Sequence, residues 1–404
     1  MIILVDVSGF TLPLYKPPLI TFVVLSAAES CIAHAYIRPV MTFDLKAMAT
    51  CRSEGTVASL VTKLHTKAND TLCVCSIKDG TALLTAHDAS LVKIWSTEDG
   101  SLVHDVQTPV QGCASCVCAS PITEHNFMVS VDDTVLVYDH RDLLTPAHQF
   151  NFNQEEVNEI DVHPKGNFLS SCDDGGDIKV IDVGNAKLFK TLSRQHSNIC
   201  STVKFHPRKP WELISGGLDC NLVRWDFNRG RALSHISVSD EECSKQFGMY
   251  TINPPMVHSI DTLNSSVVCG LGNGSVAVYG LQGKSLIPKC SAALHSASVA
   301  HVCCAELSKG KSSQRSLIIS GGNDEKIVVS ELREEVDKET TETVRKGKKR
   351  VPSETQLRVL LRIDHGSKVN WIGSYSLKDS SSSLCRIYVA DQTQYVSVYE
   401  VKER

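Results

Sequence analysis

Short segments of alternating apolar and polar residues, separated by polar turns, follow one another along most of this chain. Between residues 200 and 236 four such segments occur in succession: Cys200–Phe205, Leu213–Gly216, Asn221–Trp225 and Ala232–Ile236. Alternation with a period of two residues predicts β-strands rather than amphipathic helices. The four segments together therefore predict one four-stranded antiparallel sheet.

This group of segments recurs as an internal repeat. Its third segment ends at Trp95, Tyr138, Ile181 and Trp225, in steps of 43, 43 and 44 residues. Turn prolines keep the same spacing, at Pro121, Pro164 and Pro207. Looser copies end at Tyr279, Ser330 and Tyr399. The chain therefore contains seven units.

Seven small sheets bury their faces only by packing against one another, and radial stacking gives a closed ring. We therefore predict an all-β, seven-bladed β-propeller over residues 56–404. The segment Thr56–Lys63 precedes the first unit, and we expect it to pair beside the last strand, Tyr395–Val401, and so close the ring.

Residues 1–55 differ in composition and are expected to be a poorly ordered extension outside the propeller. The apolar run Leu19–Leu25 is similar to the end of a signal peptide, which leaves secretion open. Asp6, Lys16 and two prolines interrupt this stretch, and no window reaches the roughly 18 apolar residues that a membrane helix needs. We therefore expect no membrane partner. Met41 and Met48 are candidate alternative translation starts.

Composition narrows the classes of function. Of the 404 residues, 42% are hydrophobic and 21% are charged, which is typical of globular proteins and excludes a wholly disordered or collagen-like chain. The formal net charge of −4 gives no global attraction to phosphates, so we expect no direct nucleic-acid binding.

The 16 cysteines lie mostly in apolar runs, where reduced thiols pack as small hydrophobic groups. Cys113, Cys116 and Cys118 have the spacing of a metal knuckle, but no second Cys/His pair follows at ligand spacing. We expect no metal and no cofactor. The cluster Gly270–Gly274 is interpreted as a strand and turn rather than a dinucleotide fingerprint, which needs a βαβ unit. With no nucleophile elbow or phosphate loop either, we expect no enzyme activity.

The strand-end pair Trp225-Asp226, altered to Tyr138-Asp139 and Ile181-Asp182, resembles the signature of the WD-repeat (WD40) family over residues 56–404. This resemblance implies that hydrogen bonds between a His, a Ser or Thr, an Asp and the strand-end Trp pin each blade. The matching residues are His196, Ser215, Asp219 and Trp225 in the fourth unit, His65, Thr85, Asp88 and Trp95 in the first, and His295, Ser320 and Asp324 in the sixth. Ser330 replaces the Trp of the sixth unit. A catalytic dyad is the alternative, but one His–Asp pair per blade favours structure.

A subset of this family carries an Arg three residues after the strand-end aromatic residue, which in that subset contacts the damaged-DNA-binding adaptor of cullin-4 ubiquitin ligases. Tyr138, Asp139 and Arg141 match this pattern and are the candidate adaptor-binding residues. An Arg at a strand exit projects a planar fork that binds carboxylates or carbonyls in a bidentate manner. The alternative is that Arg141 pairs with Asp139 or Asp142 on its own turn.

Two hypotheses for function follow. The first is a non-catalytic substrate receptor that holds the cullin-4 adaptor and an unknown substrate protein. The second is a general scaffold or peptide reader with no ligase attached. A charged insertion, 332–356, is expected to form a solvated loop between blades six and seven. The alternative interpretation is that its basic run, Arg345–Arg350, is a nuclear-import signal. We therefore expect the chain in the cytoplasm, the nucleus or both.

Overall fold

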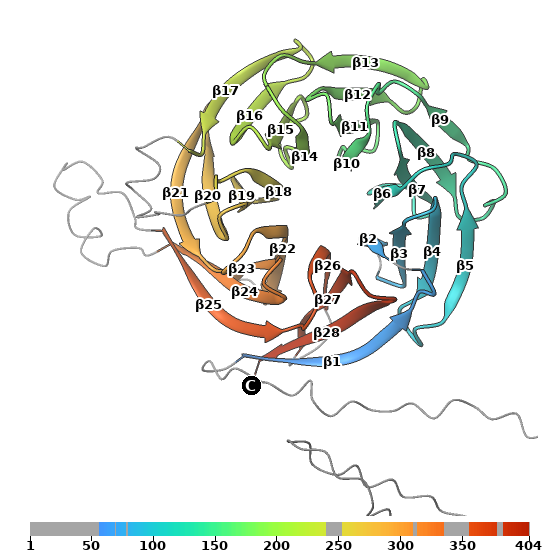
Figure 1. The fold of residues 1–404 in the computed structure, drawn as a ribbon. Helices are drawn as coiled ribbons and strands as arrows, with labels where there is room; N and C mark the ends of the chain where they lie inside the picture. The colour runs from blue at the N-terminus through green and yellow to red at the C-terminus, as the bar shows by residue number, and fades with distance from the viewer. Residues whose placement is uncertain are drawn as a thin grey trace, which may run out of the picture. The chain divides into compact units, whose positions relative to one another are not determined.

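The computed structural model describes residues 56–68, 70–77, 80–239, 253–309, 313–334, 355–377 and 383–403. All of them belong to the unit Leu45–Arg404, and the predicted extension, 1–55, lies outside the described residues. In this unit the described residues form seven four-stranded antiparallel sheets (Figure 1), which confirms the predicted all-β propeller.

Each sheet except the last takes four consecutive strands. The first three sheets are β2(Thr71–Ser76), β3(Ala82–His87), β4(Leu91–Ser96) and β5(Leu102–Gln107); β6(Ala114–Ala119), β7(Asn126–Val131), β8(Thr134–Asp139) and β9(His148–Phe150); and β10(Val157–Val162), β11(Phe168–Asp173), β12(Ile178–Asp182) and β13(Lys187–Leu192). The next three are β14(Cys200–Phe205), β15(Glu212–Gly217), β16(Asn221–Asp226) and β17(Arg231–Ser237); β18(Val257–Leu263), β19(Ser266–Leu271), β20(Ser275–Gln282) and β21(Ser285–Ala293); and β22(Val299–Lys309), β23(Ser313–Gly322), β24(Lys326–Glu334) and β25(Thr355–Asp364).

The seventh sheet closes the ring with strands from both ends of the described chain. It contains β26(Val369–Ser376), β27(Ser383–Asp391), β28(Tyr395–Glu403) and β1(Thr56–His65), in the order β1-β28-β27-β26. β1 pairs antiparallel with β28, from Thr56 opposite Glu403 to His65 opposite Tyr395. The predicted closure is therefore confirmed, and β28 has a partner instead of an open edge.

The predicted insertion, 332–356, does not lie between blades six and seven. Its described ends are strand residues of β24 and β25, which pair with each other in the sixth sheet. The insertion therefore joins the third and fourth strands of one sheet. The basic run Arg345–Arg350 lies outside the described residues.

Apolar side chains fill the space between neighbouring sheets. Between the third and fourth sheets, Cys172 and Val180 pack with Val203, Leu213 and Trp225, all of them buried. Burying one Val or Leu side chain contributes about 1.5–3 kcal/mol, so this packing holds the ring together.

A bulge shapes the first strand of every sheet. In all seven, the pairing of the first strand with the second shifts after the first residue. A bulge adds one residue to the strand and turns the side chains that follow it. In β14, for example, the second and fifth residues are partly exposed while the third and fourth are buried. The partly exposed pair faces the channel at the centre of the ring.

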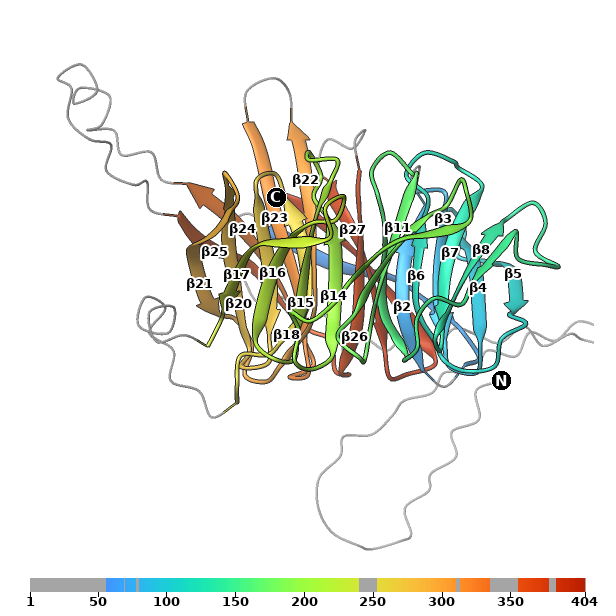
Figure 2. The ribbon, with the colours of Figure 1, turned by 90° about the horizontal axis from the view of Figure 1, so that it is seen from above.

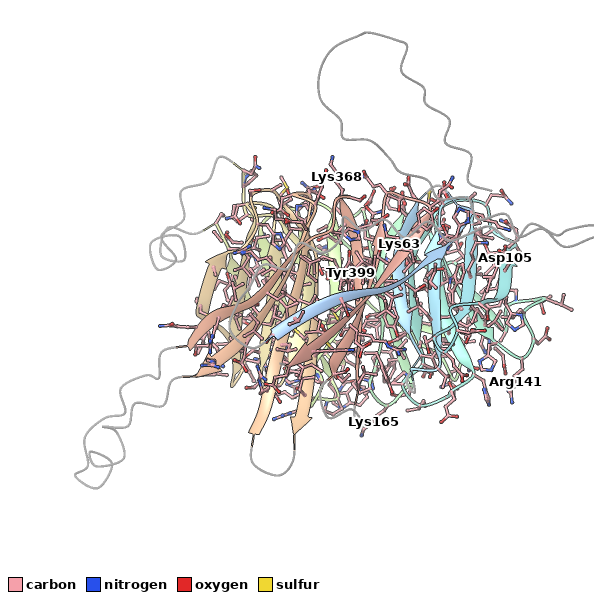
Figure 3. All side chains as sticks on the ribbon, turned by 90° about the horizontal axis from the view of Figure 1, so that it is seen from below. Lys63, Asp105, Arg141, Lys165, Lys368 and Tyr399 are labelled. Carbon is pink, nitrogen blue, oxygen red and sulfur yellow. The ribbon has the colours of Figure 1, made fainter. Side chains whose placement is uncertain are left out.

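Loops divide between the two faces of the ring (Figure 2). Because the strands alternate in direction, loops that join one sheet to the next share one face with the loops between second and third strands. Lys368 lies on this face, and Arg141 and Lys165 lie on the opposite one (Figure 3). We call these the Lys368 face and the Arg141 face.

Candidate functional site

Arg141 stands where the sequence predicted it, just after the end of β8. Its side chain is 64% exposed and binds the carboxylate of Asp139 with both ends of its fork. Nε lies 2.9 Å from Oδ1, and Nη2 lies 2.5 Å from Oδ2. The backbone N–H of Arg141 also donates to Asp139, at 3.0 Å. The structure therefore contains the ion pair on the same turn, with the outer side of the guanidinium open to solvent.

The side-chain hydrogen bond from Arg141 holds the pKa of the Asp139 carboxyl well below its usual range. Both groups are exposed, so this pair adds little to stability. Its effect is orientation, because two parallel hydrogen bonds fix the plane of the guanidinium.

A shallow cavity of about 390 Å³ adjoins Arg141, between β5 and the loop that follows β8. We name this surface the Arg141 site. Its lining residues are His104, Asp105, Val106, Gln107, His140, Arg141, Leu143 and Leu144. Leu144 is 94% exposed and places an apolar side chain on the same surface as the Arg141 guanidinium.

Tyr138 does not belong to this surface, which corrects the predicted contact set. It is only 1% exposed, and its ring stacks on Phe127 at a centroid distance of 5.4 Å. The alternation along β8 turns Tyr138 into the space between sheets and leaves Asp139 at the strand end. Tyr138 therefore contributes to the packed core between sheets and not to the exposed surface around Arg141.

The fourth sheet holds the predicted pinning residues together. His196 bonds through Nε2 to Ser215 Oγ at 2.8 Å and through Nδ1 to Asp219 Oδ1 at 3.1 Å. Trp225 Nε1 donates to the same serine oxygen at 2.8 Å. Although burial raises the pKa of Asp219, hydrogen bonds from His196 and from the side chain of Asn221 lower it to about 2.

The sixth sheet has the shortened version that the sequence predicted. His295 bonds to Ser320 at 2.9 Å and to Asp324 at 2.8 Å. Ser330, in place of the tryptophan, donates instead to the carbonyl oxygen of Ile318 at 3.2 Å.

The first sheet differs from the prediction. Thr85 Oγ1 accepts from Trp95 Nε1 at 2.9 Å, but the histidine bonded to it is His87, at 2.8 Å. His65 belongs to β1 in the seventh sheet and packs against the ring of Tyr395, because the closing strand carries it there. Asp88 lies in the turn after β3, outside these hydrogen bonds.

Two further networks escaped the sequence reasoning. In the third sheet, Asn153 donates to Asp173 at 2.9 Å and accepts from Ser171 at 2.7 Å. In the seventh, the ring of His365 bonds to Asp391 and to the hydroxyl of Tyr399, both at 2.8 Å. A positional signal identifies both: His196, His295, Asn153 and His365 each stand four residues before the first strand of their sheet.

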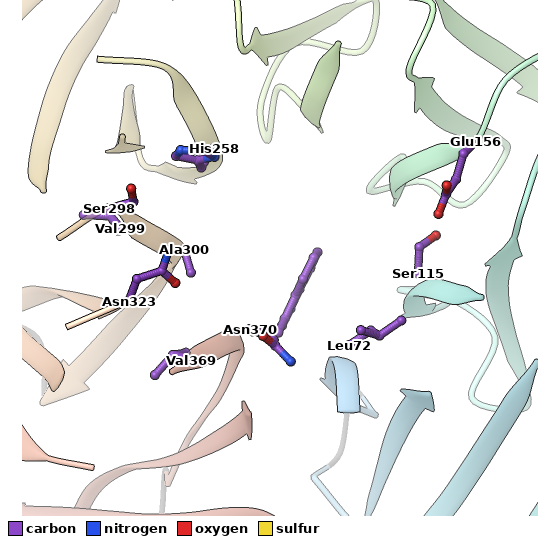
Figure 4. Close-up of a pocket in the computed structure, with 11 residues that line it drawn as sticks. Leu72, Ser115, Glu156, His258, Ser298, Val299, Ala300, Asn323, Val369 and Asn370 are labelled. Carbon is purple, nitrogen blue, oxygen red and sulfur yellow. The ribbon is translucent and has the colours of Figure 1, made fainter. Parts of the chain in front are cut away.

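The mouth of the channel on the Lys368 face is a second open surface. A cavity of about 420 Å³ lies there, lined by second residues of first strands together with sheet-joining loops. Figure 4 shows Leu72, Ser115 and Glu156 on one side and His258, Ser298 and Asn323 on the other. Apolar side chains, among them Leu72, Val299 and Trp371, line the cavity together with these polar groups.

Reactive groups in the described part of the chain are dispersed. The structure brings no three described His, Cys, Asp or Glu side chains into a metal-holding group. Its 13 described cysteines are free thiols, and Cys113 is exposed. Gly270 lies in β19, one residue before its end, and Gly274 lies in the turn that follows, as predicted for a strand and turn. No described helix is long and apolar enough to cross a bilayer.

Comparison with known proteins agrees with this geometry. Residues 144–182 and 186–226 match the family described as WD domain, G-beta repeat. The chain is also similar to the WD repeat-containing protein 53 homolog of Dictyostelium discoideum. The two are 25% identical over 363 residues, which cover 84% of this chain and 94% of that protein.

Proposed function

We propose that this chain, whose residues 144–182 and 186–226 match the WD domain, G-beta repeat family, is a substrate receptor that the Arg141 site attaches to the damaged-DNA-binding adaptor of a cullin-4 ubiquitin ligase. The coarser role, a protein-interaction scaffold, follows from the propeller itself, whose loops present variable side chains on a rigid ring. The finer role depends on one observation: an exposed arginine fixed in orientation beside an exposed leucine.

The chemistry of the Arg141 site suits a protein partner. Asp139 holds the guanidinium in one plane, so less side-chain entropy is lost when a partner carbonyl or carboxylate binds its outer edge. Leu144 supplies apolar area at the same place. Interfaces gain most of their affinity from a few central residues, among which arginine is enriched, and truncating such a residue costs about 2 kcal/mol or more.

The general scaffold or peptide reader without a ligase is the second candidate. The polar cavity at the Lys368 face favours it, because that cavity is larger than the Arg141 site and is lined by several first strands. In the receptor hypothesis the same cavity is available for the substrate protein, since it lies on the face opposite Arg141.

Co-purification of the full chain with the purified adaptor separates the two candidates. Arg141→Ala and Leu144→Ala should each lower adaptor recovery about tenfold or more. Arg229→Ala is the matched control: this arginine is 62% exposed and lies 3.7 Å from Asp226, just after the third strand of the fourth sheet. Equal recovery with Arg141→Ala and Arg229→Ala, or no recovery with the native chain, would leave the scaffold candidate.

A further inference from the structure

The mouth of the channel on the Arg141 face is lined by one residue from every blade. Each is the fifth residue of its first strand, and together they line a cavity of about 270 Å³. The seven residues are Cys75, Cys118, Asp161, Lys204, Asp261, Cys303 and Gly373. Four of the seven are small and uncharged, so the charged side chains of the third, fourth and fifth blades dominate the chemistry of this mouth.

These charges do not balance. Lys204 Nζ lies 2.6 Å from Glu159 Oε1 and 3.9 Å from Asp161 Oδ1. The carboxylate of Asp261 accepts from two backbone N–H groups, those of Cys304 and Thr262, each at 2.7 Å. One ammonium group therefore faces three carboxylates, and it lies closer to Glu159 than to Asp161.

Burial is the main influence on the pKa values of the two aspartates at this mouth. Burial raises the pKa of Asp161 to about 6, and it also raises the pKa of Asp261. Although burial lowers the pKa of Lys204, Glu159, Asp161 and Asp261 raise it well above its usual value. A second cation at this mouth would offset the repulsion among the carboxylates.

A buried histidine, His301, belongs to the lining of the same cavity. His301 is 6% exposed, lines the cavity and stacks on Trp371 at a centroid distance of 4.0 Å. Its Nδ1 accepts from the N–H of Ile372 at 3.4 Å, which places the ring hydrogen on Nε2. Within the described part of the chain, Nε2 has no hydrogen-bond partner. A buried donor without an acceptor is unfavourable, and a ligand oxygen would satisfy it.

We propose that this mouth, the channel acid site formed by Asp161, Lys204, Asp261, His301 and Trp371, binds a basic residue from an extended segment of a protein partner. The ammonium or guanidinium group lies by Asp161 and Asp261. A backbone carbonyl of the same segment accepts from Nε2 of His301. A simple alkylamine offers the cation without the acceptor, so it satisfies only part of the site. The proposal concerns a different surface from the Arg141 site and does not depend on ligase attachment.

Calorimetric titration of the full chain with three probes tests the ligand chemistry. The probes are acetyl-Gly-Gly-Arg-Gly-Gly-amide, the same peptide with norleucine in place of arginine, and butylguanidinium. The arginine peptide should bind about tenfold or more tightly than either of the others. Equal affinity of the arginine and norleucine peptides, or no heat from any probe, would overturn the proposal. Equal affinity of the arginine peptide and butylguanidinium would overturn the role of His301.

Substitutions locate the binding. Asp161→Asn and Asp261→Asn keep an acceptor oxygen for the backbone but remove a charge, and each should weaken the arginine peptide about tenfold. Glu124→Gln removes one charge from an exposed loop between β6 and β7, on the same face, and should change the affinity less than about twofold. Equal effects of the three substitutions would contradict the proposed location.

His301→Phe keeps a ring that stacks on Trp371 and removes both the Nε2 donor and the Nδ1 acceptor of the Ile372 N–H. It should weaken the arginine peptide and leave butylguanidinium unchanged, whereas parallel losses would show a merely structural role. Arg141→Ala should leave peptide binding intact while it lowers adaptor recovery about tenfold or more, so the two proposals fail separately.

Discussion

Ser215 is the position where one substitution best tests the pinning network. Its Oγ bonds to Nε2 of His196 and accepts from Nε1 of Trp225, both at 2.8 Å, and the residue is fully buried. Ser215→Ala leaves two buried polar atoms without a partner. Each such atom costs about 1–3 kcal/mol, so the free energy of unfolding should fall by about 2–6 kcal/mol.

Ser320→Ala is the matched comparison in the sixth sheet. Ser320 bonds to His295, but Ser330 stands where the fourth sheet has its tryptophan, so the substitution leaves only the imidazole nitrogen without its partner. The expected loss is about 1–3 kcal/mol. The difference between the losses in free energy of unfolding of the two variants measures the contribution of the hydrogen bond from the indole N–H of Trp225.

Urea unfolding followed by circular dichroism and by tryptophan fluorescence gives both values under the same conditions. Both variants carry the same chemical change, because each loses one serine hydroxyl from the second strand of a sheet. Equal destabilisation of the two proteins would refute the reasoning, because it would show that the bond to Trp225 contributes nothing beyond the bond to histidine.

Three further predictions concern stability. The pKa of Asp219 is held at about 2 in the folded protein, below its unfolded value of roughly 3.9. Its contribution to the free energy of unfolding is therefore full above pH 4 and is lost as the pH falls from about 4 to 2. The urea midpoint should drop in this pH range, and the drop should be smaller in Asp219→Asn. Leu64→Ala, in the closing strand, should cost about 2–4 kcal/mol because Leu64 is 5% exposed, whereas Val61→Ala, at 49% exposed, should cost less than about 1 kcal/mol in the same assay. Gly274→Ala should lower the free energy of unfolding by about 2–4 kcal/mol, because its Cβ would meet the backbone carbonyl oxygen of His295 and its φ is +85°. Gly283→Ala has a φ of +57° and open space around the Cβ, so it should cost about 1–2 kcal/mol. Thermal melting of the two variants measures the difference.

Much of the fold follows from local patterns in the sequence. The period-two segments predict the strands, and Cys200–Phe205 has the limits of β14. The steady interval between Trp95, Tyr138 and Ile181 reveals the repeat. Both signals lie within about 44 residues, so they need no knowledge of which sheets become neighbours.

The first and last sheets show where local reasoning stops. His65 is near Thr85 in sequence, but ring closure places β1 beside β28, so His65 enters the seventh sheet and His87 bonds to Thr85. The position four residues before the first strand, a histidine in the fourth sheet, is Lys67 in the first. A pairing between opposite ends of the chain decides this assignment, and no short window of sequence contains it.

The sequence by itself determined seven sheets, the closing strand and the pinning residues of the fourth and sixth sheets, because the alternation of side chains and the repeat length act within one blade. Only the tertiary structure decided what faces outward: it buried Tyr138, fixed Arg141 on Asp139, and gathered Asp161, Lys204 and Asp261 around one channel mouth. Those three come from different blades, and their distances depend on how the sheets pack around the ring, which is a property of the closed structure.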